Sequence, residues 1–426
     1  MESLKGIFDS MLQRNMDEFG SVLNEETLHE KTAEVRKNMD ELESIDSLKE
    51  LFSINSVPYS KEIGTHPDFQ DLDPGQTKYQ YITSVFLDIS GSTQLNLKFN
   101  LEEVQVIKNA IIQTAIQIFQ IFDGHIHRLQ GDAVFSYFGH RNMEKSNAII
   151  NALNASSLMQ AYNKYTLNDF FEFNDLEPPK IRIGIDIGDD DQVLWSVYGF
   201  ETTSEVTSTS LHTDLAAKLQ AKSPRNKIMI GENIYKFLDL PQEFLKTKEY
   251  QENGETKRDL YILENNRLQA KYGMQIFDWE NYLNTFVSFS DDNNKYQAPV
   301  DFRVDCYYKD GDDYNKLYIS NGSSLPKNID LKFRLNIRDT WLKKSCAHVI
   351  WTVINRGCDA ENSQEQLKFN MDKYEGHSYC LQKTAYNGHH FMECKLFDSR
   401  KNLLAKSKFG IYINDEKYRM PTVGTQ

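Results

Sequence analysis

The sequence predicts an α+β domain with helices packed on a mixed sheet, followed by an antiparallel β-sandwich and preceded by a helical extension. Three patterns predict this order. From Tyr79 to Asn265, strand-like runs alternate with helical runs. Beyond Asp301 the helical period disappears, and apolar residues alternate in steps of two. The first 75 residues are rich in Glu and Lys, with apolar residues at helical intervals.

Composition narrows the class of protein. At about 150 residues per domain, 426 residues correspond to two or three domains. The formal net charge of −14 argues against a protein whose main role is to bind nucleic acid. The longest apolar stretch, 111–122, is broken by glutamines, and the N-terminus lacks a signal-peptide pattern. Five cysteines without a CxxC pair are typical of reduced thiols. The sequence therefore predicts a cytoplasmic protein without membrane or nucleic-acid partners.

Changes in pattern divide the chain into four segments. They are a helical N-terminal extension over 1–75, an α+β domain over 76–265, a helical or irregular linker over 266–298 and a β-sandwich over 299–426. The extension carries apolar residues at helical spacing, namely Leu23, Leu28, Val35, Met39, Leu42 and Leu48. Turn-forming residues such as Pro58, Pro74 and Gly75 predict an irregular connector over 56–75. In the sandwich, Asn387-Gly388 lies between two alternating runs and predicts a β-hairpin.

The elements of the α+β domain follow from local patterns. Apolar alternation or continuous apolar runs predict strands over 81–88, 180–187, 193–198 and 227–230, and two strands joined by a tight turn over 124–138. Helical spacing predicts helices over 101–122, 143–165, 211–221 and 232–238.

Two acidic residues lie at predicted strand ends. Asp88 ends the buried strand 81–88 and is followed by a small polar loop, ISGST, which leads into a helix. Asp132 lies at the tip of the next hairpin. Side by side, two such carboxylates bind divalent metal ions that bridge phosphates, and the loop amides suit a polyphosphate. The structural alternative is that each Asp is only a capping or turn residue.

Four motifs together resemble the class III nucleotidyl cyclases. Residues 86–93, FLDISGST, are similar to that family's F-x-D-I-x-G-[FS]-T motif, and 128–132, RLQGD, to its K-x-x-G-D hairpin. Residues 181–188, IRIGIDIG, resemble its R-[IV]-G-[IV]-x-x-G strand, and 214–219, DLAAKL, stand where the family has N-x-A-x-R-[LM]. The resemblance implies an enzyme that converts a nucleoside triphosphate to a cyclic nucleotide and diphosphate, a phosphorus–oxygen lyase.

Metal and phosphate roles can be carried over where positions match. The resemblance implies that Asp88 and Asp132 ligate two Mg²⁺ or Mn²⁺ ions, with the Ile89 carbonyl as a further ligand. The backbone amides of Ser92 and Thr93 would hold the β- and γ-phosphates.

Residues for the transition state depart from the family pattern. Asp214 stands where the family has the Asn that positions the ribose, and Lys218 where it has the Arg that stabilises the transition state. Ionised Asp only accepts hydrogen bonds, and Lys is a point charge rather than a fork. Four residues apart on a helix, the two side chains can instead form a solvated ion pair. A triphosphate-contacting Lys is expected beyond the last strand, and Lys257 is the candidate.

The resemblance also implies a homodimer. In the family, the metal residues and the transition-state residues of one site come from two different cyclase domains. This chain contains one such domain, so two chains would form two equivalent sites at their interface. The N-terminal helices would add to that interface.

The predicted base pocket differs most from those of purine cyclases. Adenylate cyclases of the family have Lys at the position of Arg128 and Asp or Thr at that of Thr207, and guanylate cyclases have Glu and Cys. Arg128, with Tyr81 narrowing the same wall, predicts a pocket for a single ring, its guanidinium facing the O2 carbonyl of a pyrimidine. Thr207 can donate or accept a hydrogen bond and therefore leaves CTP and UTP undistinguished.

Both wall residues have structural alternatives. Tyr81 lies seven residues before Asp88, so an ideal strand points the two side chains to opposite faces, and a twist or bulge is needed to bring Tyr81 to the pocket. Tyr81 is otherwise an ordinary aromatic strand residue, and Arg128 a solvated hairpin arginine.

The C-terminal segment indicates a biological role. Residues 351–361, WTVINRGCDAE, resemble the W-x-V-x-N-x-G-x-x-A motif of the sensor-type domain in pyrimidine cyclases of bacterial anti-phage (Pycsar) systems. The resemblance implies that cyclic CMP or cyclic UMP acts on a separate effector, and that the tail binds a phage-derived or small-molecule ligand. The alternatives are a bacterial adenylate cyclase with a substituted pocket and a catalytically inactive ligand sensor.

Overall fold

The structure is a computed structural model of the chain. It describes residues 59–173, 177–267, 270–286, 302–361, 367–371 and 378–414, together with residues 6, 8, 9, 11, 12, 49, 54 and 420. The helices predicted around Leu23 to Leu48 lie outside these residues. The described residues form two compact units. We call them the α+β unit (2–234 and 247–277) and the sandwich unit (235–246 and 278–420).

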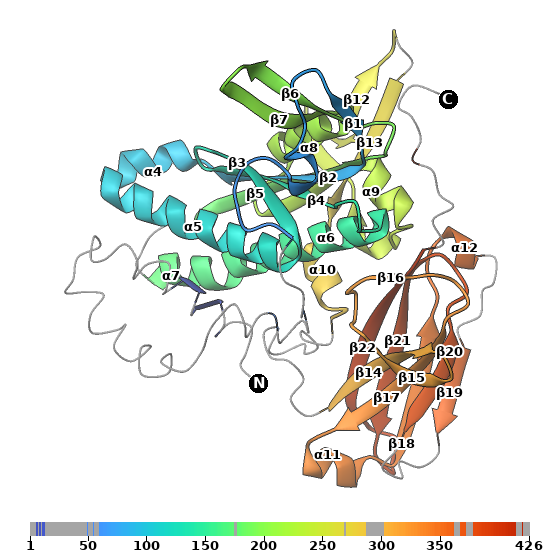
Figure 1. The fold of residues 1–426 in the computed structure, drawn as a ribbon. Helices are drawn as coiled ribbons and strands as arrows, with labels where there is room; N and C mark the ends of the chain where they lie inside the picture. The colour runs from blue at the N-terminus through green and yellow to red at the C-terminus, as the bar shows by residue number, and fades with distance from the viewer. Residues whose placement is uncertain are drawn as a thin grey trace. The chain divides into compact units, whose positions relative to one another are not determined.

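The α+β unit is built on a mixed sheet (Figure 1). Its strand order is β12-β13-β8-β5-β2-β4-β3, with β5 and β8 parallel and the other neighbours antiparallel. The strands are β2 (Ile82–Ser90), β3 (Gly124–Gln130), β4 (Ala133–Phe138), β5 (Lys180–Gly188), β8 (Lys227–Gly231), β12 (Tyr261–Asn265) and β13 (Ala270–Phe277). The predicted fold class, helices on a mixed sheet, is confirmed.

Helices cover both faces of this sheet. They are α4 (Ser92–Lys98), α5 (Leu101–Ile121), α6 (Lys145–Tyr162), the π-helix η2 (Asn163–Leu167), α7 (Asn168–Phe173), α8 (Leu211–Lys222) and the start of α9 (Glu232–Phe237). Helices α5 and α6 pack on β2, β3 and β4, whereas α8 packs across β2, β5 and β8. The close approach of α8 requires Gly184, because a Cβ there would lie 2.2 Å from the Gln220 nitrogen.

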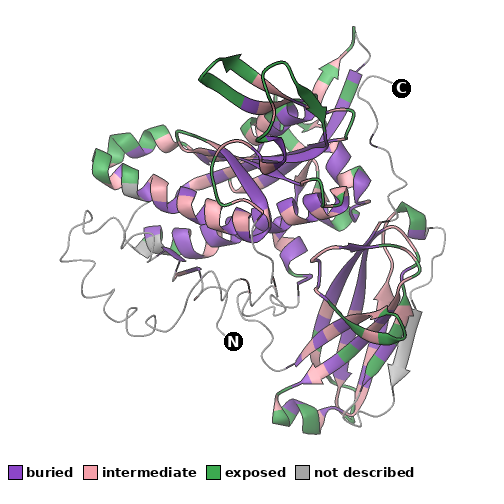
Figure 2. Ribbon diagram, viewed as in Figure 1, coloured by how far each residue is buried: buried purple, intermediate pink, exposed green. Residues whose placement is uncertain are grey.

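Two ribbons extend from the α+β unit. One is the antiparallel sheet of β1 (Thr77–Tyr79), β6 (Leu194–Phe200) and β7 (Thr203–Thr209), in the order β1-β6-β7. The other pairs β10 (Lys248–Glu252) with β11 (Glu255–Asp259). Figure 2 shows that the β6–β7 ribbon is mostly exposed.

Strand β13 lies inside the segment that the sequence predicts to be a linker. Its Met274 stands opposite Gly231 of β8, so β13 is an internal strand of the sheet. A strand buried on both faces loses the alternation by which half-buried strands are detected. In β13, Tyr272, Gly273 and Met274 are buried in succession, which explains why the pattern did not mark it.

The predicted connector before the sheet is part of the core. The short 3₁₀ helix η1 (Pro67–Phe69) places Phe69 against Trp195, with ring centroids 4.1 Å apart and planes 17° apart. Phe69 is 1% exposed. The segment from Tyr59 to Phe69 therefore packs on the sheet rather than merely linking domains.

The sandwich unit consists of two sheets. One has the order β15-β14-β17-β20 and the other β16-β22-β21-β18-β19. The strands are β14 (Phe302–Asp310), β15 (Asp313–Tyr318), β16 (Ser324–Leu325), β17 (Asp330–Ile337), β18 (His348–Ile354), β19 (Leu367–Met371), β20 (Tyr379–Lys383), β21 (Gly388–Phe397) and β22 (Leu403–Ile413). Short elements accompany them, namely η3 (Gln242–Phe244), β9 (Leu245–Lys246), α10 (Trp279–Leu283), α11 (Thr340–Ser345) and α12 (Cys358–Glu361).

The predicted sandwich is confirmed, because both sheets contribute to one buried core that includes Phe333, Trp351 and Phe409. Its pairs are antiparallel except for the two-residue pairing of β16 with β22. The hairpin predicted at Asn387-Gly388 is wrong. Strand β20 before it pairs with β17, whereas β21 after it pairs with β18 and β22. Asn387-Gly388 therefore lies where the chain passes from one sheet to the other. Gly388, with φ of +120°, is the first residue of β21.

Candidate active site

Asp88 and Asp132 lie at neighbouring strand ends. Asp88 is near the end of β2, directly opposite Ala133 of β4. Asp132 precedes Ala133 in the turn that joins β3 to β4. Gly131 in this turn has φ of +65°, a conformation that glycine adopts without strain. Both carboxylates are partly exposed, so the strand pairing presents them together at one open edge of the fold.

A guanidinium accompanies Asp88. Arg182 stands opposite Asp88 in β5, and its Nη2 donates a hydrogen bond to Asp88 Oδ2 at 2.5 Å. The Arg182 and Asp88 side chains are 28% and 21% exposed. The sequence marks Arg182 only as part of a strand motif, because the register between β2 and β5 cannot be read from either strand alone. The arrangement places a cation directly beside the Asp88 carboxylate.

The loop after Asp88 leads from β2 into α4. Gly91 precedes the helix with φ of +80°, and the helix begins at Ser92. The N–H groups of Ser92 and Thr93 are therefore among the first helical donors, which have no intrahelical acceptor. Ile89, the residue directly after Asp88, is buried.

Asp214 and Lys218 lie on the exposed face of α8. The helix begins after Ser210, whose Oγ accepts a hydrogen bond from the His212 N–H at 3.2 Å. Leu215 on the opposite face is buried. Asp214 and Lys218 both face solvent in the single chain, one helical turn apart. They are placed to reach a neighbouring molecule rather than the core of their own unit.

Lys257 lies on the β10–β11 ribbon, where its Nζ pairs with the carboxylate of Glu252. The ribbon is joined to the end of α8, because Lys222 Nζ lies 3.2 Å from Asp259 Oδ1. The base of the ribbon, at Asp259, therefore contacts the end of α8, while Lys257 itself pairs within the ribbon; strands β12 and β13 follow it, so Lys257 does not lie beyond the last strand as predicted.

Arg128 and Thr207 come together beside the β3–β4 hairpin. The Arg128 guanidinium pairs with Glu205 of β7. Thr207, two residues further on, has its Oγ1 3.3 Å from Nε2 of His127. A bulge in β3 makes this possible, because Arg128 rather than His127 stands opposite Phe135. The two predicted base-pocket residues are thus connected through His127 and Glu205, which the sequence did not mark.

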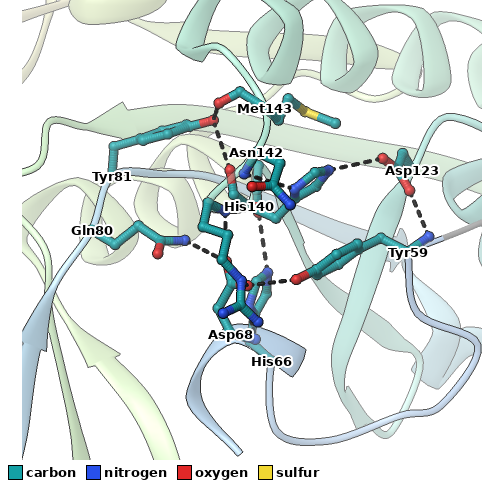
Figure 3. A network of polar contacts seen from close by, with 11 residues as sticks. Tyr59, His66, Asp68, Gln80, Tyr81, Asp123, His140, Asn142 and Met143 are labelled. Carbon is teal, nitrogen blue, oxygen red and sulfur yellow. Dashed lines mark hydrogen bonds and ion pairs between the residues drawn. The ribbon is translucent and has the colours of Figure 1, made fainter.

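Tyr81 lies elsewhere. Strand β2 pairs with β4 and β5 without a register shift, so the bulge that would turn Tyr81 towards Arg128 does not occur in these pairings. The Tyr81 hydroxyl donates to the carbonyl of Met143, just before α6 (Figure 3). Its ring lies 2.9 Å from where a Cβ on Gly139 would stand. The placement favours the alternative interpretation, a buried aromatic residue next to the strand.

A buried carboxylate organises the segment before the sheet (Figure 3). The Asp68 side chain is 0% exposed. It accepts hydrogen bonds from the Tyr59 hydroxyl at 2.5 Å, Gln80 Nε2 at 2.7 Å and the Arg141 backbone N–H at 2.7 Å. Burial alone would raise the pKa of Asp68, but these hydrogen bonds outweigh it, and the pKa lies below its usual value. Because its partners are distant in the sequence, no local pattern marks this network.

His66 completes the same network. Its Nε2 donates to the carbonyl of Gly139 at 3.1 Å, and its Nδ1 accepts from the Asp68 N–H at 3.2 Å. Burial, with a smaller contribution from His125, lowers the pKa of His66 to about 3. His66 is therefore neutral at physiological pH and holds the chain through two directed hydrogen bonds.

A family model matches the C-terminal part of the chain, and relatives with curated names match nearly all of it. A family model, the Adenylyl/Guanylyl and SMODS C-terminal sensor domain, matches residues 277–414. A Staphylococcus aureus protein named cytidylate cyclase is 47% identical over 427 residues, covering 99% of this chain and 98% of that protein. The chain belongs to the family of the cytidylate cyclases. A further cytidylate cyclase, from Escherichia coli, is 29% identical over 396 residues, covering 91% of this chain and 82% of that protein. The chain is a class III nucleotidyl cyclase with a C-terminal sensor domain.

Solved structures match the cyclase part. The adenylyl cyclase CyaB from P. aeruginosa is 20% identical with a TM-score of 0.37, covering 48% of this chain and 96% of that chain. The guanylyl cyclase Cya2 is 16% identical with a TM-score of 0.35, covering 48% and 94%. Family membership rests on the sequence relatives and not on these scores. Within the described residues, no helix is long and apolar enough to cross a membrane.

Proposed function

We propose that this cyclase converts CTP to 3′,5′-cyclic CMP and diphosphate. The observation that carries the proposal is the pairing of β2 with β4 and β5, which sets Asp88, Asp132 and Arg182 together at one edge of the sheet. The named function of the relatives supports cytidine as the base. UTP is the alternative substrate with a single-ring base.

The donor set at this edge fits a hard divalent cation. Asp88, Asp132 and the carbonyl of Ile89 offer oxygen ligands, which Mg²⁺ and Mn²⁺ prefer. The described residues contain no group of three or more His, Cys, Asp or Glu placed to bind a metal, so phosphate and water oxygens would complete the coordination. Two bound ions would lower the pKa of the ribose 3′-hydroxyl and neutralise charge on the triphosphate.

The chain's own groups position the triphosphate for in-line attack. The ribose O3′ forms a bond to the α-phosphorus, the bond from that phosphorus to the oxygen bridging the β-phosphate breaks, and the 3′ proton is released. The Ser92 and Thr93 amides would hold the β- and γ-phosphates, as helix N-terminal donors hold anions. Arg182 would exchange its hydrogen bond to Asp88 for phosphate oxygens once cations occupy the carboxylates.

A second copy of the chain would complete each site. Asp214 would hold the ribose and Lys218 would stabilise the pentavalent phosphorus, with Lys257 on the triphosphate, all from the partner subunit. Asp214 and Lys218 are exposed in the single chain, as this role requires. The β6–β7 ribbon also exposes Tyr198 and Phe200, 48% and 74%, and exposed aromatic side chains of this kind would suit an interaction surface.

Residues of the base pocket would come from the same subunit as Lys218. Strand β7 is joined to α8 by Ser208 and Thr213, whose hydroxyl oxygens lie 3.2 Å apart. The strand that carries Thr207 and pairs with Arg128 through Glu205 is therefore attached to the first turn of α8. The guanidinium of Arg128 would donate to the O2 carbonyl of cytosine and limit the depth of the pocket to one ring.

We further infer that the cyclic nucleotide is a signal in anti-phage defence and acts on a separate effector. The match of the sandwich unit to a sensor-domain model supports a ligand-receiving role for that unit. Infection of cells that express the chain should raise cyclic CMP, measured by mass spectrometry, whereas cells with Asp88→Asn should show no rise. Equal levels of cyclic CMP before and after infection would contradict the signalling role but not the proposed cyclase reaction.

Purified full-length chain tests the activity itself. Incubation with Mn²⁺ and CTP should yield cyclic CMP and diphosphate in equal amounts. Asp88→Asn, which keeps the size of the side chain, should yield neither. A folded wild-type chain that turns over no nucleotide would favour the inactive-sensor alternative, and preferred turnover of ATP would favour the adenylate cyclase alternative.

A further inference from the structure

His127 lies between the backbone of Gly64 and the side chain of Thr207. Its Nδ1 lies 2.9 Å from the carbonyl oxygen of Gly64, and its Nε2 lies 3.3 Å from Thr207 Oγ1. A carbonyl oxygen can only accept, so Nδ1 carries the proton. Burial, followed by the nearby Arg128 charge, lowers the pKa of His127, although the Gly64 bond opposes the shift. At about pH 7.5 the ring is therefore neutral, and Nε2 presents a lone pair.

The backbone around Gly64 imposes this tautomer. The Gly64 N–H donates to the Ile126 carbonyl at 3.1 Å, and its own carbonyl also accepts from His125 Nε2 at 2.8 Å. Its φ of +132° is a conformation that suits glycine. Two and four residues later, His66 and Asp68 anchor the segment in the buried network of Figure 3. Gly64 is thus a fixed acceptor that keeps the His127 proton on Nδ1.

Because Nε2 can only accept, its hydrogen bond with Thr207 requires the Thr207 hydroxyl to donate. The Thr207 oxygen then offers only acceptor lone pairs to the Tyr137 hydroxyl, which also hydrogen-bonds it, and to any further partner. Cytosine and uracil share the O2 carbonyl but differ at C4, where cytosine has an amino group and uracil a carbonyl. An oxygen that can only accept pairs with the amino hydrogens and repels the carbonyl.

We propose that His127 is a positioning residue that makes Thr207 an acceptor and so selects CTP over UTP. The inference rests on the proposed function, namely that the pyrimidine lies against Arg128 and Thr207. It resolves a choice that Thr207 by itself leaves open, since a free hydroxyl can serve either base.

The test compares kcat/KM for CTP and UTP in the full-length chain with Mn²⁺. His127→Phe keeps the ring that packs against Phe135 and Tyr137 but removes the acceptor. The CTP/UTP ratio should fall at least about tenfold, because a group left without its partner costs that much discrimination. His127→Gln, which returns an amide oxygen near the Nε2 position, should recover much of the ratio. His125→Phe is the matched control, since His125 shares the Gly64 carbonyl, and it should leave the ratio unchanged.

Thr207 provides a second, independent variant. Thr207→Ser should keep the CTP preference and Thr207→Val should lose it, even if His127→Phe proves unstable. A wild-type preference for CTP that survives both His127→Phe and Thr207→Val would overturn the inference while the proposed function stands. Wild-type turnover of UTP equal to that of CTP would also overturn it, and a lack of turnover of either pyrimidine would overturn the proposed function as well.

Discussion

The two parts of the proposed site, a phosphate end and a base end, are built in different ways. At the phosphate end, Asp88 and Asp132 are partly exposed, and Asp214 and Lys218 face solvent. At the base end, the Arg128–Glu205 ion pair is exposed, but the groups behind it, His127 and Tyr137, are buried and hydrogen-bonded. Tyr137 is 0% exposed, its hydroxyl lies 2.9 Å from Ser208 Oγ, and burial raises its pKa to about 12.

The difference follows from the cost of burial. A charge that waits for a metal, a triphosphate or a second subunit must stay near water, because an unpaired buried charge is strongly destabilising. A neutral hydrogen-bond network can be completed inside one chain and can therefore fix the orientation of donors and acceptors before substrate arrives. We therefore expect changes at the phosphate end to remove activity without loss of fold, and changes at the base end to alter substrate choice.

Removal of either strand-end carboxylate should have the largest effect. Asp88→Ala and Asp132→Ala should each lower CTP turnover at least about a thousandfold, because charge on the triphosphate would no longer be neutralised. Asp191→Ala is a control at an exposed position away from both strand ends. Circular dichroism should show an unchanged fold in all three variants. If either catalytic variant kept more than a tenth of wild-type turnover in Mn²⁺, the metal assignment would be wrong.

Subunit mixing tests whether the residues at the phosphate end come from two different chains. Asp88→Ala and Lys218→Ala chains, each inactive, should together recover about a quarter to a half of wild-type activity, because one interfacial site per mixed dimer is intact. A mixture of Asp88→Ala and Asp132→Ala chains should recover no activity, because in each site both residues come from the same chain. Absence of recovery in the first mixture, with subunit exchange shown by mass labelling, would place the whole site within one chain.

Arg128 tests the base end. Arg128→Ala should lose most of the CTP rate, about a hundredfold in kcat/KM, because the base loses a fixed donor fork. Glu205→Gln, which changes only the ion-pair partner of that guanidinium, should cost much less. Equal losses for the two variants would mean that the ion pair, rather than contact with the base, explains the effect of Arg128.

The smallest effect concerns stability and pH. The pKa of His66 in the folded chain, about 3, lies below its ordinary value of 6.5, so the unfolded chain binds more protons between these limits. Stability should therefore fall as the pH falls below 6.5, and the lowered pKa of Asp68 acts in the same direction at lower pH. From pH 6.5 to 5.5, His66 should contribute a fall in Tm of about 2–4 °C. His66→Asn should lower the Tm at pH 8 but flatten this slope in a differential scanning experiment, and an unchanged slope would contradict the assignment.

The sequence was sufficient for features that are local. Asp88 and Asp132 each belong to a short motif at a strand end, and the fold class followed from alternating patterns. Arg182 and His127 were not marked because their contacts depend on register and on a bulge, which arise only when strands pair. Tyr81 shows the converse, since it was predicted to narrow the wall of the base pocket beside Arg128, and the structure instead places its hydroxyl on the carbonyl of Met143.

A competition among nucleotides tests the central claim most directly. Full-length chain with Mn²⁺ and equal concentrations of CTP, UTP, ATP and GTP should form cyclic CMP, with pyrimidine turnover at least about a hundredfold above that of either purine. Mass spectrometry of the four cyclic products gives the answer in a single experiment. Formation of cyclic AMP at an equal or greater rate would contradict the proposal that the base end was built for a single ring.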